Sequence, residues 1–172
     1  MNRKTKLVLG LIAGFFLAIG LDQWTKLLAV SHLKDAAPYT IWEGVFELFY
    51  SENRGAAFGM LQGRQGFFLL VATIVLICAI TSIIRMPATR KYLPLHVIAC
   101  FLSAGATGNM IDRFVRGYVV DFLYFKLINF PIFNVADCYV TISMFVFVLL
   151  FLFYYKEEDL SCLLGSRKGE RA

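Results

Sequence analysis

Two aspartates, Asp121 and Asp137, are the residues whose type and setting point most directly to catalysis. They border a strongly apolar stretch, residues 117–137, and the following segment 138–155 carries no charge. No basic residue lies within four positions of Asp137. Carboxylates next to such apolar segments are costly in a membrane, so they usually pair, face the protein interior or take part in function.

Two carboxylates that the chain brings together can activate water. Asp121 and Asp137 are sixteen residues apart, which is enough chain to fold back on itself. Two carboxylates in close contact share one proton, because both cannot ionise cheaply. The ionised member can take a proton from water while the neutral member polarises a peptide carbonyl, which is the chemistry of peptide hydrolysis. The spacing leaves open which aspartate takes which role.

Other polar residues occur at helical spacing. Asp22 and Lys26 are four positions apart, as are Asn109 and Arg113, so each pair would lie on one face of a helix. Asp112 is three positions after Asn109 and would join the same face. We interpret Asp22 and Lys26 as a structural ion pair, and Asp112 could likewise fix a helix end.

Two further clusters have ordinary structural readings as well. The segment 53–55, Asn-Arg-Gly, is typical of a turn. Asn134 or Asp137 could cap the first turn of a helix. Each cluster alone is weak evidence for a site, but all of them fall at the same ends of the apolar segments.

The elements that must position these residues are membrane helices. The chain has 172 residues, of which 59% are hydrophobic and 17% are charged, whereas soluble domains average about 45–50% and about 25%. Four segments approach the roughly 20 residues that a helix needs to cross a bilayer. They are residues 7–30, 66–85, 93–112 and 134–155, and we expect them to belong to one domain, 1–172.

The distribution of Lys and Arg predicts the orientation of these segments, since basic residues are enriched on the cytoplasmic side. With four spans, ten basic residues share one side: Arg3, Lys4, Lys6, Arg85, Arg90, Lys91, Lys156, Arg167, Lys168 and Arg171. Both termini are therefore predicted to be cytoplasmic, with the acidic clusters at the outer face. The net charge of +5 follows this topology, so we expect no nucleic-acid partner.

The outer segments are predicted to be small. Residues 40–62 alternate partly between apolar and polar types, which favours a small β-sheet at the membrane surface. Residues 113–133 are expected to form a short loop or helix on the same side, and residues 156–172 a flexible tail. The spacing of the four cysteines and two histidines suggests no metal site.

The ordered motifs Asp-Gln-x-x-Lys, Asn-Arg-Gly-Ala-Ala-Phe, Gly-Asn-x-x-Asp-Arg, Val-Val-Asp-Phe and Phe-Asn-Val-Ala-Asp, on four spans, resemble the bacterial lipoprotein signal peptidases (signal peptidase II). The resemblance covers nearly the whole chain. It implies an all-α membrane protein with four transmembrane helices and a small extracytoplasmic β-cradle. It also implies an aspartyl peptidase of the bacterial inner membrane, a target of globomycin, that cuts prolipoproteins before a cysteine bearing diacylglycerol.

By this resemblance, Asp121 and Asp137 are similar to the catalytic pair. Six residues match motif positions that line the substrate site: Asn53, Gly55, Asn109, Arg113, Asn134 and Ala136. Asp22, Lys26 and Asp112 match supporting positions. The resemblance implies no cofactor or metal, and we expect a monomer whose partners are lipid-modified prolipoproteins and membrane lipid.

Two other classes stay open. In a small transporter or proton relay, the intramembrane polar residues would line a pathway. However, the polar residues gather on one side, and the inner halves of the spans are almost purely apolar. A structural assembly subunit would explain the packing of segment 108–113, Gly-Asn-Met-Ile-Asp-Arg, but it gives no reason for two unpaired aspartates.

Overall fold

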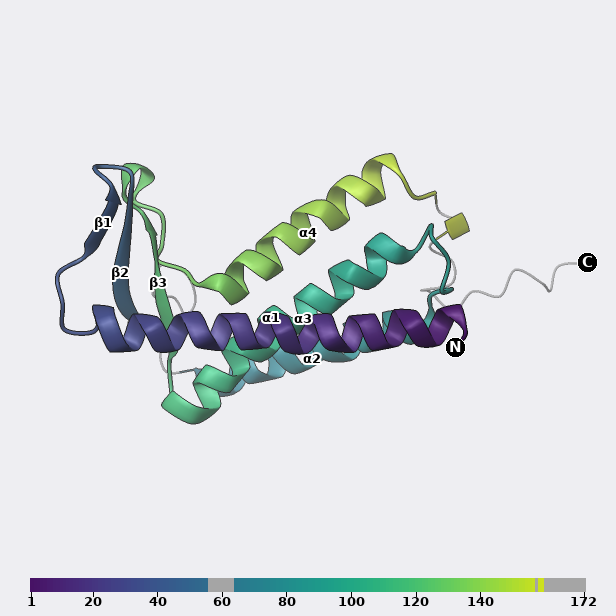
Figure 1. The fold of residues 1–172 in the computed structure, drawn as a ribbon, viewed down its shortest axis with the longest axis horizontal. Helices are drawn as coiled ribbons and strands as arrows, with labels where there is room; N and C mark the ends of the chain where they lie inside the picture. Colours follow the sequence, from purple (N-terminus) through teal and green to yellow (C-terminus); the bar gives the residue numbers. More distant parts are fainter. Residues whose placement is uncertain (56–63, 157, 160–172) are drawn as a thin grey trace, which may run out of the picture.

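The computed structural model describes residues 1–55, 64–156 and 158–159. Within this part of the chain, four long helices run along the molecule and a small sheet closes one end (Figure 1). The helices are α1 (Arg3–Leu33), α2 (Gln65–Arg85), α3 (Leu93–Arg116) and α4 (Val135–Phe153). All four are long and apolar enough to cross a membrane, which confirms the predicted fold class.

Helix α3 is the centre of the bundle and packs against each of the other three helices. More than half of its most apolar segment is buried inside the protein, whereas the other helices expose most of their apolar surface. Small residues on α3 let α4 approach closely: a Cβ atom added at Gly105 would lie 2.6 Å from the carbonyl oxygen of Ala136. The central helix therefore carries its polar residues to where α1 and α4 converge.

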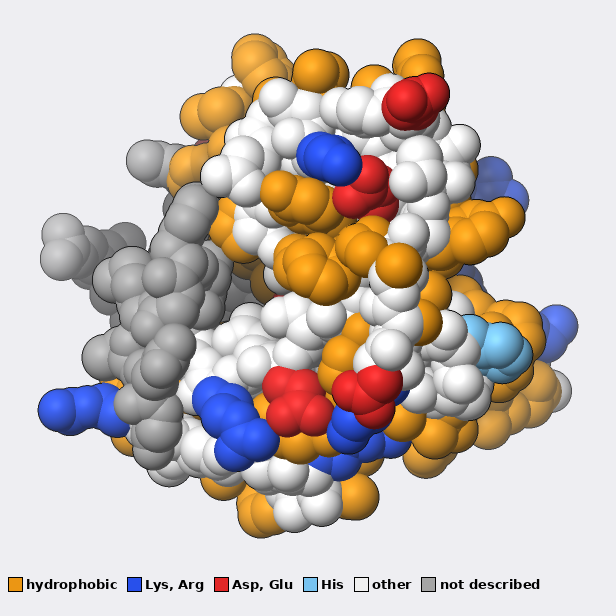
Figure 2. Space-filling model, turned by 90° about the vertical axis from the view of Figure 1, so that its left-hand side faces the viewer, with side chains coloured by type: hydrophobic (Ala, Val, Ile, Leu, Met, Phe, Trp, Pro, Cys, Tyr) orange, Lys and Arg blue, Asp and Glu red, His pale blue; other side chains and the backbone are white. Residues whose placement is uncertain are grey.

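The sheet has the strand order β1-β2-β3, and both pairs of neighbouring strands are antiparallel. Its strands are β1 (Tyr39–Trp42), β2 (Phe46–Asn53) and β3 (Val119–Phe125). Val120 and Phe122 of β3 pack with Ala29 of α1 in an apolar cluster, which fixes the sheet on the end of the helix bundle. We call this sheet the β-cradle. Seen from its end of the molecule, it mixes charged and exposed apolar side chains (Figure 2).

The second outer segment differs in part from the prediction. Its short helical element exists, as the 3-10 turn η2 (Lys126–Ile128), but strand β3 comes before it. Pairing of β3 with β2 places Asp121 opposite Ser51, so the strand carries one of the two aspartates. Of the predicted outer β segment 40–62, residues 56–62 lie outside the described residues. The same holds for residues 157 and 160–172 of the predicted tail.

The N-terminus of α1 and the C-terminal end of α4 lie at the same end of the molecule, opposite the β-cradle (Figure 1). At this end, the Nζ atom of Lys91 lies 2.6 Å from the Oδ1 atom of Asp159. The hydroxyl group of Tyr155 donates to the carbonyl of Lys91 at 2.6 Å. These contacts fix the end of α4 to the connection before α3.

Candidate active site

Asp121 and Asp137 converge on one residue, Asn134. The Nδ2 atom of Asn134 donates to Oδ1 of Asp121 at 2.6 Å. The backbone N–H of Asn134 donates to Oδ2 of Asp137 at 3.1 Å. The structure thus brings both predicted catalytic aspartates into contact with a single asparagine.

Asn134 holds this position because it caps helix α4. Its side-chain oxygen accepts the backbone N–H of Asp137 at 3.0 Å, and the carboxylate of Asp137 accepts the N–H of Asn134 in return. This reciprocal capping box is typical of a helix start. Asp137 therefore sits in the first turn, where the helix dipole favours a negative charge. The capping interpretation from sequence is right, and the same carboxylate still faces the site.

Asp121 is buried on β3 and accepts amide hydrogens on both carboxylate oxygens. Besides Asn134, the Nδ2 atom of Asn53 donates to its Oδ2 at 2.9 Å. Burial, followed by the charge of Asp137, raises the pKa of Asp121 to about 7, although both amide hydrogen bonds act in the opposite direction. Asp121 can therefore hold a proton close to neutral pH.

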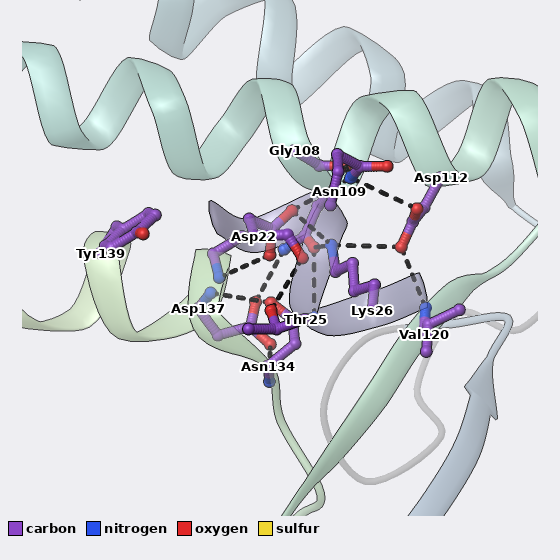
Figure 3. A network of polar contacts seen from close by, with 12 residues as sticks. Asp22, Thr25, Lys26, Gly108, Asn109, Asp112, Val120, Asn134, Asp137 and Tyr139 are labelled. Carbon is purple, nitrogen blue, oxygen red and sulfur yellow. Dashed lines mark hydrogen bonds and ion pairs between the residues drawn. The ribbon is translucent and has the colours of Figure 1, made fainter. Parts of the chain in front are cut away.

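A buried ion cluster lies beside Asp137 and Asn134 (Figure 3). The Nζ atom of Lys26 lies 3.0 Å from Oδ2 of Asp22 and 3.1 Å from Oδ2 of Asp112, and all three side chains are fully buried. Arg116 forms a second ion pair with Asp112. The four charges balance, which is what a buried cluster needs in order to persist in an apolar protein.

The two aspartates of the cluster also bind backbone next to the catalytic pair. Asp22 Oδ1 accepts the N–H of Ala136 at 2.9 Å, one residue before Asp137. Asp112 Oδ2 accepts the N–H of Val120 at 3.1 Å, one residue before Asp121. The cluster therefore fixes the start of α4 and the start of β3 relative to each other.

The remaining predicted site residues surround this centre. Asn109 donates from Nδ2 to Oδ1 of Asp137 at 2.8 Å. Arg113 lies 4.6 Å above the ring of Phe68 and donates to the carbonyl of Gly55 at 3.4 Å. Ala136 is fully buried, so in this structure it supports the site by packing and presents no surface to a ligand.

The sequence analysis did not assign site roles to Gln23 and Arg116. Gln23 donates to the carbonyl of Gly108 at 3.1 Å and to Asp22 at 3.0 Å, and so joins α1 to α3. Arg116 is four residues after Asp112, and this helical spacing was a usable signal for the ion pair. Gln23 has no such signal, because its main partner lies on another helix.

A groove of about 590 Å³ leads away from the site between α2, α3 and α4. Asn109, Arg113 and Asp137 line its polar end, and the rest of its lining is mainly apolar. Among the described residues, no three His, Cys, Asp or Glu side chains are grouped to hold a metal ion. The groove can hold water against the carboxylate of Asp137 and an extended apolar segment alongside.

Known proteins are similar to this chain in sequence and in fold. The model of the family described as signal peptidase (SPase) II matches residues 14–153. A lipoprotein signal peptidase of Caldanaerobacter subterraneus subsp. tengcongensis is 42% identical over 134 residues, 77% of this chain and 89% of the relative. One of Brevibacillus brevis is 43% identical over 131 residues, 76% of this chain and 87% of the relative.

A solved structure titled as a bacterial membrane enzyme, determined by the in meso method at 2.3 Å resolution, matches with a TM-score of 0.75. It is 29% identical, and the match covers 95% of this chain and 93% of that one. The family match covers α2, α3 and α4 in full and α1 from residue 14 onward, and it includes both aspartates. The chain therefore belongs to the signal peptidase II family and is a membrane peptidase.

Proposed function

We propose that this protein removes signal peptides from prolipoproteins, cutting before the diacylglyceryl-modified cysteine with Asp121 and Asp137 as the catalytic pair. The observation that carries the proposal is the contact of both carboxylates with Asn134, together with the position of Asp137 at the polar end of an apolar groove. The names of the relatives, lipoprotein signal peptidases, support the class of substrate.

The environments of the two carboxylates support a division of roles. Asp137 lies in the first turn of α4 and accepts a backbone N–H, both of which favour the ionised form. Asp121 carries the proton, since its pKa is raised to about 7 by burial and by the charge of Asp137. Two carboxylates in unlike environments are the usual basis of acid and base roles.

In the proposed reaction, ionised Asp137 takes a proton from water while protonated Asp121 donates its proton to the oxygen of the scissile carbonyl. The water oxygen attacks the carbonyl carbon and gives a tetrahedral intermediate. The C–N bond then breaks, and the proton held by Asp137 passes to the leaving amine of the cysteine. Asp121 recovers its proton as the new carboxyl group forms, so protons balance over the cycle.

The groove supports a lateral route for the substrate. Its lining from α2 and α4 is mainly apolar, including Val71, Val75 and Met144, so a signal-peptide segment can enter from the bilayer. Asn and Arg side chains at the polar end, Asn109 and Arg113, can bond the backbone of an extended peptide. Binding the apolar segment in the groove brings the peptide bond beside the carboxylates.

The same proposal places the protein in the bacterial inner membrane as a monomer, with both termini in the cytoplasm and the β-cradle at the outer face. The basic residues at the end opposite the cradle support this orientation. Labelling of single cysteines introduced in the β1–β2 turn by a membrane-impermeant reagent on intact cells tests it. Labelling only after permeabilisation contradicts it.

The substrate class is tested with purified protein and two matched precursor peptides, one carrying diacylglycerol on the cysteine and one without it. We expect cleavage before the cysteine of the lipidated peptide, and at least about a hundredfold slower cleavage of the other, because the lipid adds apolar area that holds the substrate in the membrane. Equal cleavage of both peptides contradicts lipid recognition. Proton flux across liposomes without any peptide, and no cleavage, would support a proton relay instead.

A further inference from the structure

Lys26 uses every hydrogen-bond donor of its ammonium group on buried partners. Two of these partners are carboxylates: the Nζ atom lies 3.0 Å from Oδ2 of Asp22 and 3.1 Å from Oδ2 of Asp112. The third is Oδ1 of Asn109, at 2.9 Å. A lysine ammonium has three donors and no acceptor, so its neighbours must all present oxygen.

This contact determines which way the amide of Asn109 points. Because Oδ1 of Asn109 faces Lys26, and also accepts from Nδ2 of Asn134 at 3.2 Å, its NH₂ group must face the other way. On that side it donates to Oδ1 of Asp137 at 2.8 Å. The reversed amide would place NH₂ against two donors and an oxygen against a carboxylate, losing all three hydrogen bonds.

The donors on Asp121 are held differently. The oxygen of Asn134 accepts the N–H of Asp137, and the oxygen of Asn53 accepts the N–H of Gly55 at 3.0 Å. Neutral backbone groups therefore orient both amides that reach Asp121. Only Asp137 receives an amide that a buried cation orients.

We propose that Lys26 is a positioning residue for catalysis: by fixing the amide of Asn109 it holds an N–H donor on Asp137 and makes Asp137 the ionised member of the pair. This inference rests on the proposed function, which it deepens by giving the cluster around Lys26 a part in the reaction. Lys26 acts through Asn109 and is not expected to touch the substrate.

Charged and titratable groups surround Asp137 on several elements. They are Lys26 and Asp22 of α1, Arg113 of α3, Asp121 of β3 and the neighbouring Cys138 of α4. A change at Lys26 alone would alter the electrostatic field as well as the amide. The test must therefore separate the charge of Lys26 from its hydrogen bond.

The double substitution Asp22→Asn/Lys26→Met removes one charge of each sign and leaves the Asp112–Arg116 ion pair intact. The asparagine keeps an oxygen that can accept the N–H of Ala136. The variant thus keeps the net charge of the buried cluster while it frees the amide of Asn109. Asp22→Asn alone is the matched control, because it keeps the contact between Lys26 and Asn109.

The measurement is the pH dependence of kcat and KM on a lipidated precursor peptide, with full-length protein in detergent. For the double variant we expect the acid limb of the kcat profile, where Asp137 takes up a proton, to move to higher pH by about one unit. The reason is that Asp137 loses an oriented hydrogen-bond donor. KM should stay within about twofold, because the apolar lining that holds the signal-peptide segment is unchanged. In the Asp22→Asn control the acid limb should not move to higher pH, since this change only removes a negative charge near Asp137.

Asn109→Ala keeps all buried charges and tests the same inference independently, because it removes the amide that donates to Asp137. It should move the acid limb as far as the double variant does, and the two changes together should move it no further. The inference is overturned if the acid limb of either variant lies at the wild-type pH. It is also overturned if the shifts of the two variants add when the changes are combined. The proposed function fails separately, if the wild-type protein leaves the lipidated precursor uncut or if variants lacking either aspartate carboxylate still cut it.

Discussion

Replacing Asp121 with Asn should separate stability from catalysis. Burial and the charge of Asp137 raise the pKa of Asp121 from 3.8 to about 7, so the folded chain holds a proton that the unfolded chain releases. A carboxyl group of this kind stabilises the fold fully below pH 3.8, and this contribution is lost as the pH rises to 7. About three pH units, at about 1.4 kcal/mol each, amount to about 4 kcal/mol.

The asparagine of the Asp121→Asn variant cannot ionise, so this variant does not lose that stability as the pH rises. However, both oxygens of Asp121 accept amide hydrogens, from Asn53 and Asn134, and an asparagine offers one oxygen, so one hydrogen bond is lost at about 1 kcal/mol. We expect the variant to be less stable than wild type by about 1 kcal/mol at pH 4 and more stable by about 3 kcal/mol at pH 8. Denaturant unfolding in detergent measures both differences. A difference that stays constant between the two pH values refutes the reasoning.

Three further predictions concern pH and packing. Cleavage by wild type should fall about tenfold per pH unit above 7, as Asp121 loses its proton; a flat kcat/KM profile from pH 7 to 9 contradicts this. Asn53→Ala removes a donor that lowers the pKa of Asp121, so this alkaline limb should move up by about one unit, whereas an unmoved limb argues against that role. Gly108→Ala should destabilise the fold by about 1–3 kcal/mol, because its Cβ would overlap the buried carboxylate of Asp22. Gly10→Ala, where a Cβ meets nothing within 4 Å, is the control, and equal melting temperatures would count against the packing argument.

The helices and the catalytic candidates could be predicted because their signals are local. Hydropathy alone marks four apolar segments, and the fold confirms them. Asp121 and Asp137 stood out because no basic residue lies within four positions of either, and the structure brings both to Asn134. An unexplained carboxylate in an apolar setting is informative without any knowledge of the fold.

Other features depend on contacts between distant segments and had no such signal. Strand β3 forms because Val119–Phe125 pairs with β2, far away in the chain, so its sequence alone did not distinguish it from a loop. Helical spacing predicted that Lys26 would pair with Asp22. It could not predict that the same ammonium group also contacts Asp112 and Asn109 on α3, because spacing reports only neighbours on one helix.

The most direct test of the account is the rate at which purified Asp121→Asn and Asp137→Asn variants cut a lipid-modified precursor at pH 6.5. Both should fold and bind the precursor, and each should cut at least about a thousandfold more slowly than wild type, because each loses one half of the acid–base pair. Wild-type cleavage by either folded variant would contradict the central claim that the two carboxylates work together on one peptide bond.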